Sequence, residues 1–257
     1  MILATGGSSM VKAAYSSGTP AIGVGAGNAP VLICNDADIA KAAQNVITGK
    51  SFDNGVICGS ENNLVVVSTV VDEFTRQMEA NGAIILTADE KMRFTPQVFD
   101  PESATLKKSL VGKSARFIAD QAGIRPGKDI RLIVVPIRSD EAKGPYAHEK
   151  LAPILSLSTV KDEDEGIRLC KQILKNQGLG HTAVIHTQSR ESMVRFGQEI
   201  EASRILVNVA ASFGCVGIGS GLAPSFTLGC GTFGGNSTTD NVTYTHLLNI
   251  KRLSVNF

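Results

Sequence analysis

The sequence has little charge imbalance and no long apolar run. Its 257 residues carry 25 Lys or Arg and 24 Asp or Glu, a net charge of +1, so neither a basic face for nucleic acid nor an acidic tail is expected. The longest apolar runs, residues 132–136 and 205–209, fall far short of the roughly 20 residues of a membrane-spanning helix. We therefore expect a soluble protein with no nucleic-acid or membrane partner.

Cysteine is sparse and scattered. The five cysteines are odd in number and follow no secretory leader, so reduced thiols and a cytoplasmic location are expected. The chain has no Cys-x-x-Cys and no His-Glu-x-x-His motif, and His181 and His186 lie five positions apart on an expected strand. No metal site is predicted.

Strand-like and helix-like runs alternate along most of the chain. Helices are predicted over residues 36–50 with Asp36 as N-cap, 71–80, 113–122, 161–176 and 190–202. Strands are predicted within residues 20–33 and over 64–68, 83–86, 131–136, 182–187 and 204–209. This alternation is typical of an α/β fold with a parallel sheet covered by helices. Residues 89–128 are more polar and show no pattern of chemistry.

A short loop around Cys58 stands out. The run FDNGVICGSE at residues 52–61 begins with an Asp-Asn-Gly helix breaker and leads into the next strand, which places Cys58 on a turn. A thiol on such a Gly-flanked turn is exposed and rigid, as a nucleophile requires. The alternative is a buried structural cysteine, because free Cys is among the most buried residue types.

The first residues predict a second feature of interest. Residues 2–14 read as the end of a strand, a Gly/Ser turn and the start of a helix. Such a turn can present backbone N–H groups to a phosphate. An ordinary strand-to-helix loop is the alternative.

Four separated motifs share one explanation: VGAGNAP at residues 24–30, the Cys58 loop, HEKLAP at 148–153 and GLGHT at 178–182. Their order and spacing resemble the aldehyde dehydrogenase superfamily. The runs MVKAAYSSG at 10–18 and APSFTLGCG at 223–231 are similar to its CoA-acylating branch, above all to the aldehyde dehydrogenase half of bifunctional aldehyde-alcohol dehydrogenases. The resemblance extends from residue 2 to about residue 250 and is weakest across residues 89–128.

The resemblance implies a domain organisation. Residues 1–52 would be the C-terminal part of a Rossmann-type nucleotide-binding domain, and residues 53–222 an α/β catalytic domain. Residues 223–257 would return to the nucleotide-binding or oligomerisation region. The break at residues 53–55 is the best candidate for a domain border.

The resemblance makes Cys58 the nucleophile and His181 a general base for Cys58 or for the CoA thiol. A free thiol is only about 3% ionised at pH 7, so the site must lower the pKa of Cys58 or deprotonate it on demand. The tetrahedral oxyanion needs fixed donors, one of them the Cys58 backbone N–H. A purely structural histidine is the alternative for His181.

The resemblance also assigns binding residues. Glu149 would hold the nicotinamide ribose of NAD or NADP, with a surface glutamate paired to Lys150 as the alternative, and His148 could orient Glu149. Thr5, Gly6, Gly7 and Gly25 would lie beside the cofactor. Phe213 and Cys215 would line the aldehyde pocket, unless they are plain core.

The residue at position 24 distinguishes hydrolysis of the thioester from its transfer to CoA. Hydrolytic enzymes of the superfamily carry a glutamate general base where this chain has Val24, 34 residues before Cys58. A valine cannot activate water, so the thioester is expected to transfer to CoA. The predicted reaction is the NAD(P)-dependent oxidation of a short aldehyde, acetaldehyde by default, to acyl-CoA.

In the family, most of the nucleotide-binding sheet and the second oxyanion donor precede the position that matches Met1. We therefore expect a truncated chain, or a partner polypeptide that supplies the N-terminal half, together with homo-oligomerisation. Two alternatives stay open: a catalytically incomplete fragment that serves only in assembly, and a Cys-dependent thiol acyltransferase or thioesterase that uses no nucleotide.

Overall fold

The computed structural model describes residues 1–141 and 143–256. The strands are β1 (Ile2–Thr5), β2 (Ala21–Val24), β3 (Ala29–Ile33), β4 (Glu61–Val67), β5 (Ala83–Ile85), β6 (Leu132–Ile137), β7 (Ile154–Val160), β8 (Gly180–His186) and β9 (Ala202–Val207). The α-helices are α1 (Ser8–Ser16), α2 (Ile39–Ser51), α3 (Val71–Ala80), α4 (Ala88–Val98), α5 (Ala115–Gln121), α6 (Glu163–Asn176), α7 (Arg190–Glu199) and α8 (Ala211–Cys215). The predicted α/β fold is confirmed.

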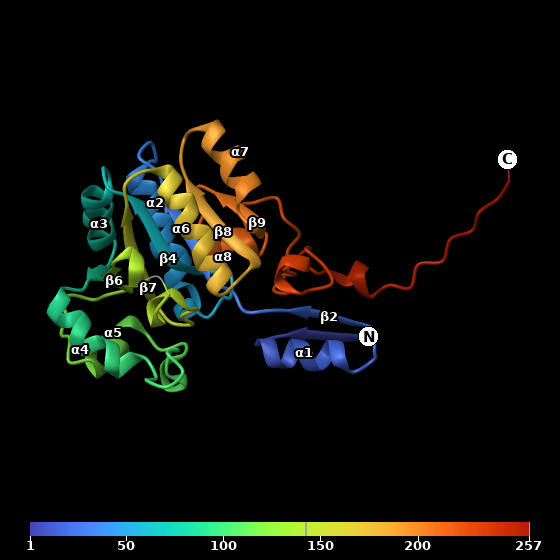
Figure 1. The fold of residues 1–257 in the computed structure, drawn as a ribbon, viewed down its shortest axis with the longest axis horizontal. Coiled ribbons are helices and arrows are strands. Elements are labelled where there is room, and N and C mark those ends of the chain that lie inside the picture. Colours follow the sequence, from blue (N-terminus) through green and yellow to red (C-terminus); the bar gives the residue numbers. More distant parts are fainter. Residues whose placement is uncertain (142, 257) are drawn as a thin grey trace.

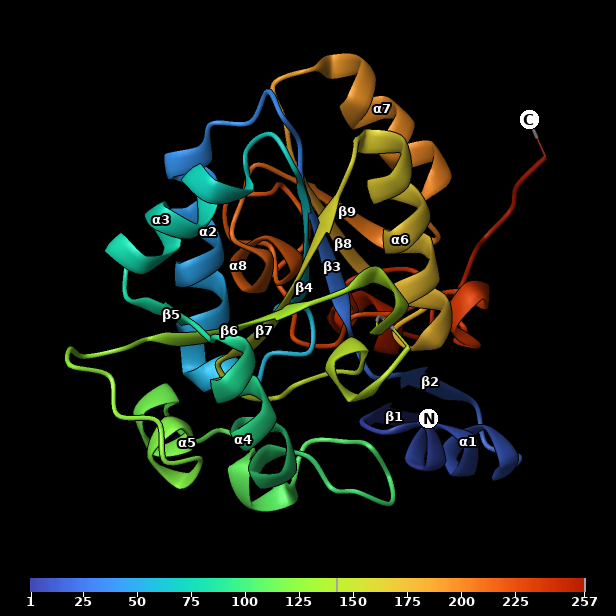
Figure 2. The same ribbon diagram turned by 60° about the vertical axis from the view of Figure 1, so that its left-hand side comes forward.

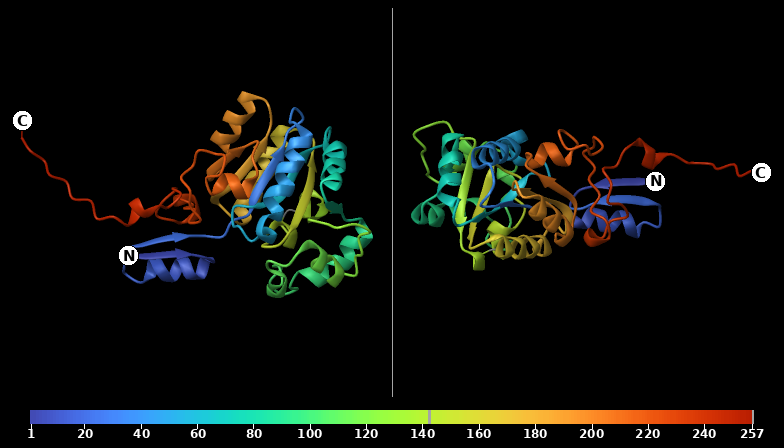
Figure 3. Two further views of the ribbon diagram at one scale, coloured as in Figure 1. Left: turned by 180° about the vertical axis from the view of Figure 1, so that it is seen from behind. Right: turned by 90° about the horizontal axis from the view of Figure 1, so that it is seen from above.

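The strands form two parallel sheets. β1 pairs with β2, and the other seven strands form one sheet in the order β5-β6-β7-β4-β3-β8-β9. Figures 1 and 3 show the small unit of β1, α1 and β2 extending from one end of the larger body, with the C-terminal tail leaving the same side of the molecule.

The predicted domain border at residues 52 and 53 falls inside the large sheet. β3 lies before this border and β4 after it, yet the two strands are paired from Ala29 and Glu61 onward. The sheets instead divide the chain between β2 and β3, at residues 25–28. Which unit binds a nucleotide and which carries out catalysis stays a prediction.

Helices cover both faces of the seven-stranded sheet (Figure 2). Val31 and Ile33 pack in one core with α2, α3 and α8, whereas Leu32 packs on the other face with α6 and α7. This alternation within β3 is the period-two pattern of a strand, and β3 is apolar on both sides because both faces are covered. A third core lies under α4 and α5.

The start of β4 differs from the prediction. The strand was expected over residues 64–68, but it begins three residues earlier at Glu61, and Glu61, Asn62 and Asn63 are buried. Asn63 donates to the Asn28 carboxamide oxygen and accepts from the Ser156 hydroxyl. Polar side chains can occupy a buried strand when such partners are present, and those partners come from elsewhere in the chain.

The start of α2 also differs from the prediction. Asp38, and not Asp36, is the N-cap, and its carboxylate accepts from the Lys41 backbone N–H at 3.0 Å. Asp36 instead accepts hydrogen bonds from Thr187, Gln188 and Ser189 in the loop after β8. The sequence shows two aspartates of equal capping ability, and the fold selects between them.

Among the other elements, α3 coincides with the predicted residues 71–80, and α5 lies within residues 113–122. α7 ends at Glu199, and β9 begins at Ala202, which pairs with Gly180. β7 and α8 were not predicted. Within the described part of the chain, no helix has both the length and the apolarity to cross a membrane.

Candidate active site

A cavity of about 250 Å³ lies between the small N-terminal unit and the amino ends of β4 and β8. Most of the predicted site residues line it. They are Thr5, Gly6, Gly7, Gly25, Cys58, Glu149 and His181. Val24, Ala26, Val56, Leu151 and Leu228 complete the lining. Segments from six parts of the sequence therefore line one cavity that contains a thiol.

The turn that carries Cys58 has an unusual backbone. Asp53, Asn54 and Gly55 have φ values of 46°, 49° and 74°, a left-handed conformation that is uncommon for residues other than glycine. Asn54 is held by a hydrogen bond from its carboxamide to the Gly112 carbonyl at 3.0 Å. The breaker predicted from the sequence is thus a fixed turn, which leaves Cys58 half-buried at its end.

The turn lies in close contact with the segment after β2. A Cβ atom added to Gly27 would lie 1.7 Å from the Cys58 carbonyl oxygen, so only glycine allows this approach. The Gly27 N–H donates to the Glu149 carboxylate at 3.0 Å. The glycine-rich run at residues 24–30 therefore brings the Cys58 turn and Glu149 together.

Cys58 is a thiol at neutral pH. Burial, and next the negative charge of Glu149, raise its pKa to about 11, although the Gly59 N–H and Arg204 act in the opposite direction. Of the two routes open to a nucleophilic cysteine, the structure favours deprotonation on demand over a lowered pKa. In the described residues, the Cys58 backbone N–H donates no hydrogen bond, so it is free to serve an oxyanion.

His181 is the second residue of β8 and is buried against the cavity. Its Nδ1 lies 2.9 Å from the Thr182 hydroxyl, and its Nε2 has no hydrogen-bond partner in the described residues. Burial, and secondarily the charge of Arg204, lower its pKa to about 3. His181 is therefore a neutral imidazole with one nitrogen free for a substrate or a thiol.

Glu149 is not the surface residue of the alternative interpretation. Burial raises its pKa to about 7, against the effects of the Gly27 N–H and of Lys50 and Lys150. Lys150 does not pair with it, because the Lys150 ammonium is buried and donates to the Tyr146 and His148 carbonyls. His148 places its Nδ1 3.3 Å from the Ala104 carbonyl and has no described contact with Glu149.

A buried lysine joins the Cys58 turn to the Glu149 segment. Lys50 is fully buried, and its ammonium donates to the Ser60 hydroxyl, the Asn62 carboxamide and the Lys150 carbonyl. Asn62 also accepts from the Lys150 N–H at 2.7 Å. Sequence reasoning missed Lys50, but its spacing from Val46 and Ile47 places it on the apolar face of α2, which was the available signal.

Phe213 and Cys215 do not line this cavity in the described structure. Phe213 packs its ring edge-on to Phe52, with ring centroids 5.0 Å apart. Cys215 is buried beneath Gly59, where an added Cβ would lie 2.4 Å from the Cys215 Sγ. The geometry fits the alternative of packing residues, while a contact with a larger substrate stays a prediction.

Arg204 was another residue missed from the sequence. It is buried and donates to the Gly229 carbonyl at 2.6 Å and to the Thr239 carbonyl at 3.2 Å. Its positive charge lowers the pKa values of Cys58, Cys215 and Cys230 against the effect of burial. An arginine at the start of a buried strand was the only sequence signal for this role.

The N-terminus of α1 fits an anionic group. Its N-cap residue Gly7 makes no side-chain cap, and the first turn holds no acidic residue. A Cβ added to Gly7 would meet no atom within 4 Å, so the backbone faces open space. Free N–H groups at the positive end of a helix are suited to a phosphate, so the chain's residues fit the pyrophosphate of a nicotinamide cofactor.

Comparison with known proteins gives consistent matches over nearly the whole chain. The family model described as "Aldehyde dehydrogenase family" matches residues 1–246. The bifunctional aldehyde-alcohol dehydrogenase of Escherichia coli is 40% identical over 99% of this chain and 29% of that protein. An acetylating aldehyde dehydrogenase structure from Geobacillus thermoglucosidasius has a TM-score of 0.95 at 41% identity, covering 100% of this chain and 56% of that one.

A further solved structure, propionaldehyde dehydrogenase of Rhodopseudomonas palustris with bound propionyl-CoA, has a TM-score of 0.83 at 29% identity. It is matched over 92% of this chain and 51% of that one. The chain thus spans about half the length of these solved enzymes and under a third of the bifunctional relative.

Proposed function

Because the chain belongs to the aldehyde dehydrogenase family, we propose that it carries the thiol half of a CoA-acylating aldehyde dehydrogenase. The proposed reaction is the oxidation of a short aldehyde, with acetaldehyde as the first candidate, to acyl-CoA by NAD or NADP. The observation that carries the proposal is the cavity that gathers Cys58, His181 and Glu149 beside the Thr5–Gly7 turn, with Val24 in place of a carboxylate.

The first step joins Cys58 to the aldehyde. The Cys58 sulfur attacks the carbonyl carbon, the carbonyl electron pair moves onto oxygen, and the thiol proton passes to a base. We assign the base to His181, whose Nε2 has no hydrogen-bond partner in the described residues, and reserve Glu149 for the cofactor ribose. Because burial lowers the pKa of His181, the thiol proton moves only as the C–S bond forms and not in the resting site. The Cys58 backbone N–H donates to the oxyanion.

A nicotinamide cofactor, when bound, supplies the hydride acceptor that converts the adduct into a thioester. The chain's own contribution would be to hold it: the Thr5–Gly7 turn and the α1 N-terminus would bind the pyrophosphate, and Glu149 would accept hydrogen bonds from the ribose hydroxyl groups. These roles are supported by the shared cavity and by the uncapped helix.

The acyl group can leave Cys58 by hydrolysis or by transfer to CoA, and the residue at position 24 distinguishes these two routes. Val24 is 2% exposed and apolar, so no base stands at its position to activate water. The CoA thiol attacks the thioester carbonyl, a new C–S bond forms, and the bond to Cys58 breaks to return the Cys58 thiolate, which is reprotonated. Acyl transfer is therefore favoured over hydrolysis.

The second half-reaction tests the proposal without any nucleotide. Incubation with acetyl-CoA should add one acetyl group to the chain and release free CoA, as followed by intact mass and peptide mapping. Cys58→Ser should abolish the acylation, while Cys215→Ser, a matched change at a packing thiol, should retain it. If Cys58 carries no acetyl group under these conditions, the proposal is wrong.

Two further arms separate the remaining readings. NADH absorbance with acetaldehyde, CoA and NAD reports the complete reaction, and acylation with no NADH indicates that the residues of this chain carry the acyl group but do not by themselves bind a nucleotide productively. Slow acylation in His181→Asn but not in Glu149→Gln supports the assignment of the base, and the opposite result transfers that role to Glu149. Silence in both assays, combined with tight self-association, favours a part used only in assembly.

Introducing a carboxylate at position 24 tests the role of Val24. Val24→Glu should divert the acetylated chain from CoA transfer to release of acetate, while Val24→Gln, which has a similar shape and no charge, should not. Acetate release by the unmodified chain at the rate of CoA transfer would argue against the acylating branch.

A further inference from the structure

A second cavity, of about 290 Å³, lies at the opposite end of the large sheet. It is lined by Asp38, Lys41, Ala42, His186, Gln188, Met193 and Asn208. These residues come from the start of α2, the end of β8, the following loop, α7 and the end of β9. The proposed reaction uses none of them.

The cavity occupies a special place in the sheet topology. β3 and β8 are neighbours, but the chain leaves β3 towards β4 through α2 on one face and leaves β8 towards β9 through α7 on the other face. The two connections diverge at the carboxyl ends of the strands and leave a crevice between them. Such switch points are where open parallel sheets bind ligands.

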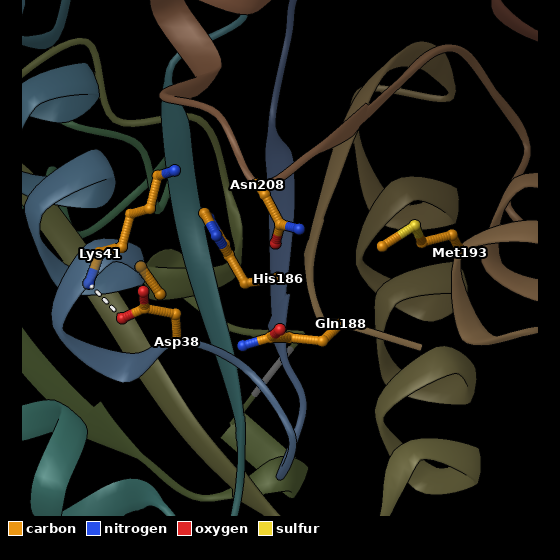
Figure 4. A pocket seen from close by; sticks show the side chains of 7 residues that line it. Asp38, Lys41, His186, Gln188, Met193 and Asn208 are labelled. Atoms are coloured by element: carbon orange, nitrogen blue, oxygen red, sulfur yellow. Dashed lines mark hydrogen bonds between the residues drawn. The ribbon is translucent and has the colours of Figure 1, made fainter. Parts of the chain in front are cut away.

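A buried imidazole forms part of the wall. His186, the last residue of β8, is only 2% exposed, and its Nε2 has no hydrogen-bond partner in the described residues. In Figure 4 its ring lies between the Lys41 side chain and Asn208. A buried polar atom without a partner is costly and calls for a missing partner.

Asp36, which is not part of the cavity lining, and Asn208, which is, are already engaged and hold the loop that borders the cavity. Asp36 accepts from the Thr187 hydroxyl and from the Gln188 and Ser189 N–H groups. The Asn208 carboxamide accepts from the Thr187 N–H and donates to the Thr187 carbonyl. These hydrogen bonds fix the loop after β8 against the ends of α2 and β9.

The unengaged groups are of mixed character. Lys41 forms no ion pair in the described part of the chain, and only one Asp38 oxygen is used, by the helix cap. The Gln188 carboxamide offers a donor and an acceptor, and Met193 an apolar surface. The lining thus offers both hydrogen-bond donors and acceptors, together with one acidic and one basic side chain.

We propose that this switch-point cavity binds a small uncharged polyhydroxylated compound, a monosaccharide or a polyol. Hydroxyl groups both donate and accept, so they match the Lys41 ammonium, the Asp38 carboxylate and the free His186 nitrogen at once. The Asp38 carboxylate disfavours a phosphate, and the Lys41 ammonium disfavours a metal cation. The Met193 thioether covers the carbon face of the ligand.

The imidazole signals of the histidines provide a site-specific test. The chain has four histidines, so a ¹H–¹⁵N spectrum of the full chain with labelled histidine gives four ring signals, each assigned by a single replacement. Titration with D-ribose, D-glucose or glycerol should shift the His186 signal with saturation in the millimolar range and leave the signals of His148, His181 and His246 unchanged.

Lys41→Met should raise the dissociation constant about tenfold, since a charged donor is lost, whereas Lys175→Met, an exposed lysine at the end of α6, should not. Saturation by inorganic phosphate, ribose 5-phosphate or Mg²⁺ without a response to neutral sugars would overturn the proposed ligand class. Equal shifts of all four signals would show that the sugar does not bind specifically beside His186. A His186 signal that is still unsaturated at about 100 mM sugar would exclude a millimolar binding site, because such a site would be nearly full at that concentration.

Discussion

The two ends of β8 carry His181 and His186, and their surroundings differ sharply. Five residues of a strand separate them by roughly 16 Å, and both are buried with an unpartnered Nε2 in the described structure. His181 faces a cavity lined by a thiol, a glycine-rich turn and mostly apolar side chains. His186 faces a cavity rimmed by exposed charged and amide groups.

The comparison teaches that burial alone does not define a reactive site. Burial is the main cause of a lowered pKa at both ends, to about 3 for His181 and about 4 for His186. The difference lies in the side chains near each histidine. The cavity at His181 contains the thiol of Cys58, which can act as a nucleophile. The cavity at His186 contains no thiol among its lining residues, so we expect it to bind a ligand without reacting with it. Four substitutions, given in order of decreasing expected effect, test this difference between the two ends of β8.

The largest effect is expected at Lys50. Lys50→Met leaves three buried acceptors without their donor, so the Cys58 turn should shift and acylation by acetyl-CoA should slow about 10²-fold. Lys41→Met, the matched change at the start of the same helix, should leave the rate within about twofold of the unmodified chain. Equal rates for Lys50→Met and the unmodified chain would remove Lys50 from the positioning role.

The next effect concerns acid stability. Burial lowers the folded-state pKa of His186 to about 4 from 6.5, so the unfolded state binds the proton more tightly, and stability is lost as pH falls from 6.5 towards 4. The loss reaches about 3 kcal/mol. Urea titrations between pH 7 and pH 4.5 should show a weaker pH dependence for His186→Leu. Lys41→Met, which keeps the imidazole, should retain the full dependence.

A smaller effect is expected beneath the Cys58 turn. Gly59→Ala would place a Cβ 2.4 Å from the Cys215 Sγ, and such overpacking costs about 1–3 kcal/mol. Removing the obstacle with Cys215→Gly in the same chain should restore part of the stability lost in thermal unfolding. A double variant as unstable as the sum of the two single variants would show that the contact is not the cause.

The smallest effect is expected at the rim of the switch-point cavity. Lys41→Met removes an exposed ammonium with no ion pair in the described residues, so the free energy of unfolding should change by less than about 0.5 kcal/mol. Calorimetry of this variant checks the assumption that Lys41 is free for a ligand. A clear loss of stability would instead assign Lys41 a structural role.

Much of the fold could be predicted because its signals are local. Residues 71–80 form α3 as predicted, and the helix predicted over residues 161–176 forms as α6, with Asp162 as N-cap ahead of an acidic first turn. Elements with polar or alternating sequences were harder. β4 was predicted too short because Glu61, Asn62 and Asn63 are polar, and β7 was missed although residues 154–160 alternate in a strand-like way.

The candidate site divides in the same manner. A cysteine in a Gly-flanked turn and a Gly/Ser turn are short-range patterns, so the sequence marks Cys58 and residues 5–7 as candidates, whereas His181 was named by the resemblance to the aldehyde dehydrogenase superfamily. The roles of these residues stay predictions. The scaffolding residues Lys50, Asn62 and Arg204 could not be named, because their acceptors lie far along the chain or on other elements. Phe213 and Cys215, placed in a pocket by resemblance, lie outside the cavity lining.

The α/β class and the turn at residues 53–55 follow from local sequence patterns, because each depends on residues close together in the chain, and the missing carboxylate at Val24 follows from the resemblance to the family. Three other features depend on packing between distant segments: the division of the sheets at residues 25–28, the choice of Asp38 over Asp36 as N-cap of α2, and the cavity that His186 lines. Those features arise where β3 and β8 lie side by side although about 150 residues separate them in the chain, and strand pairing of that kind is set by packing rather than by local propensity.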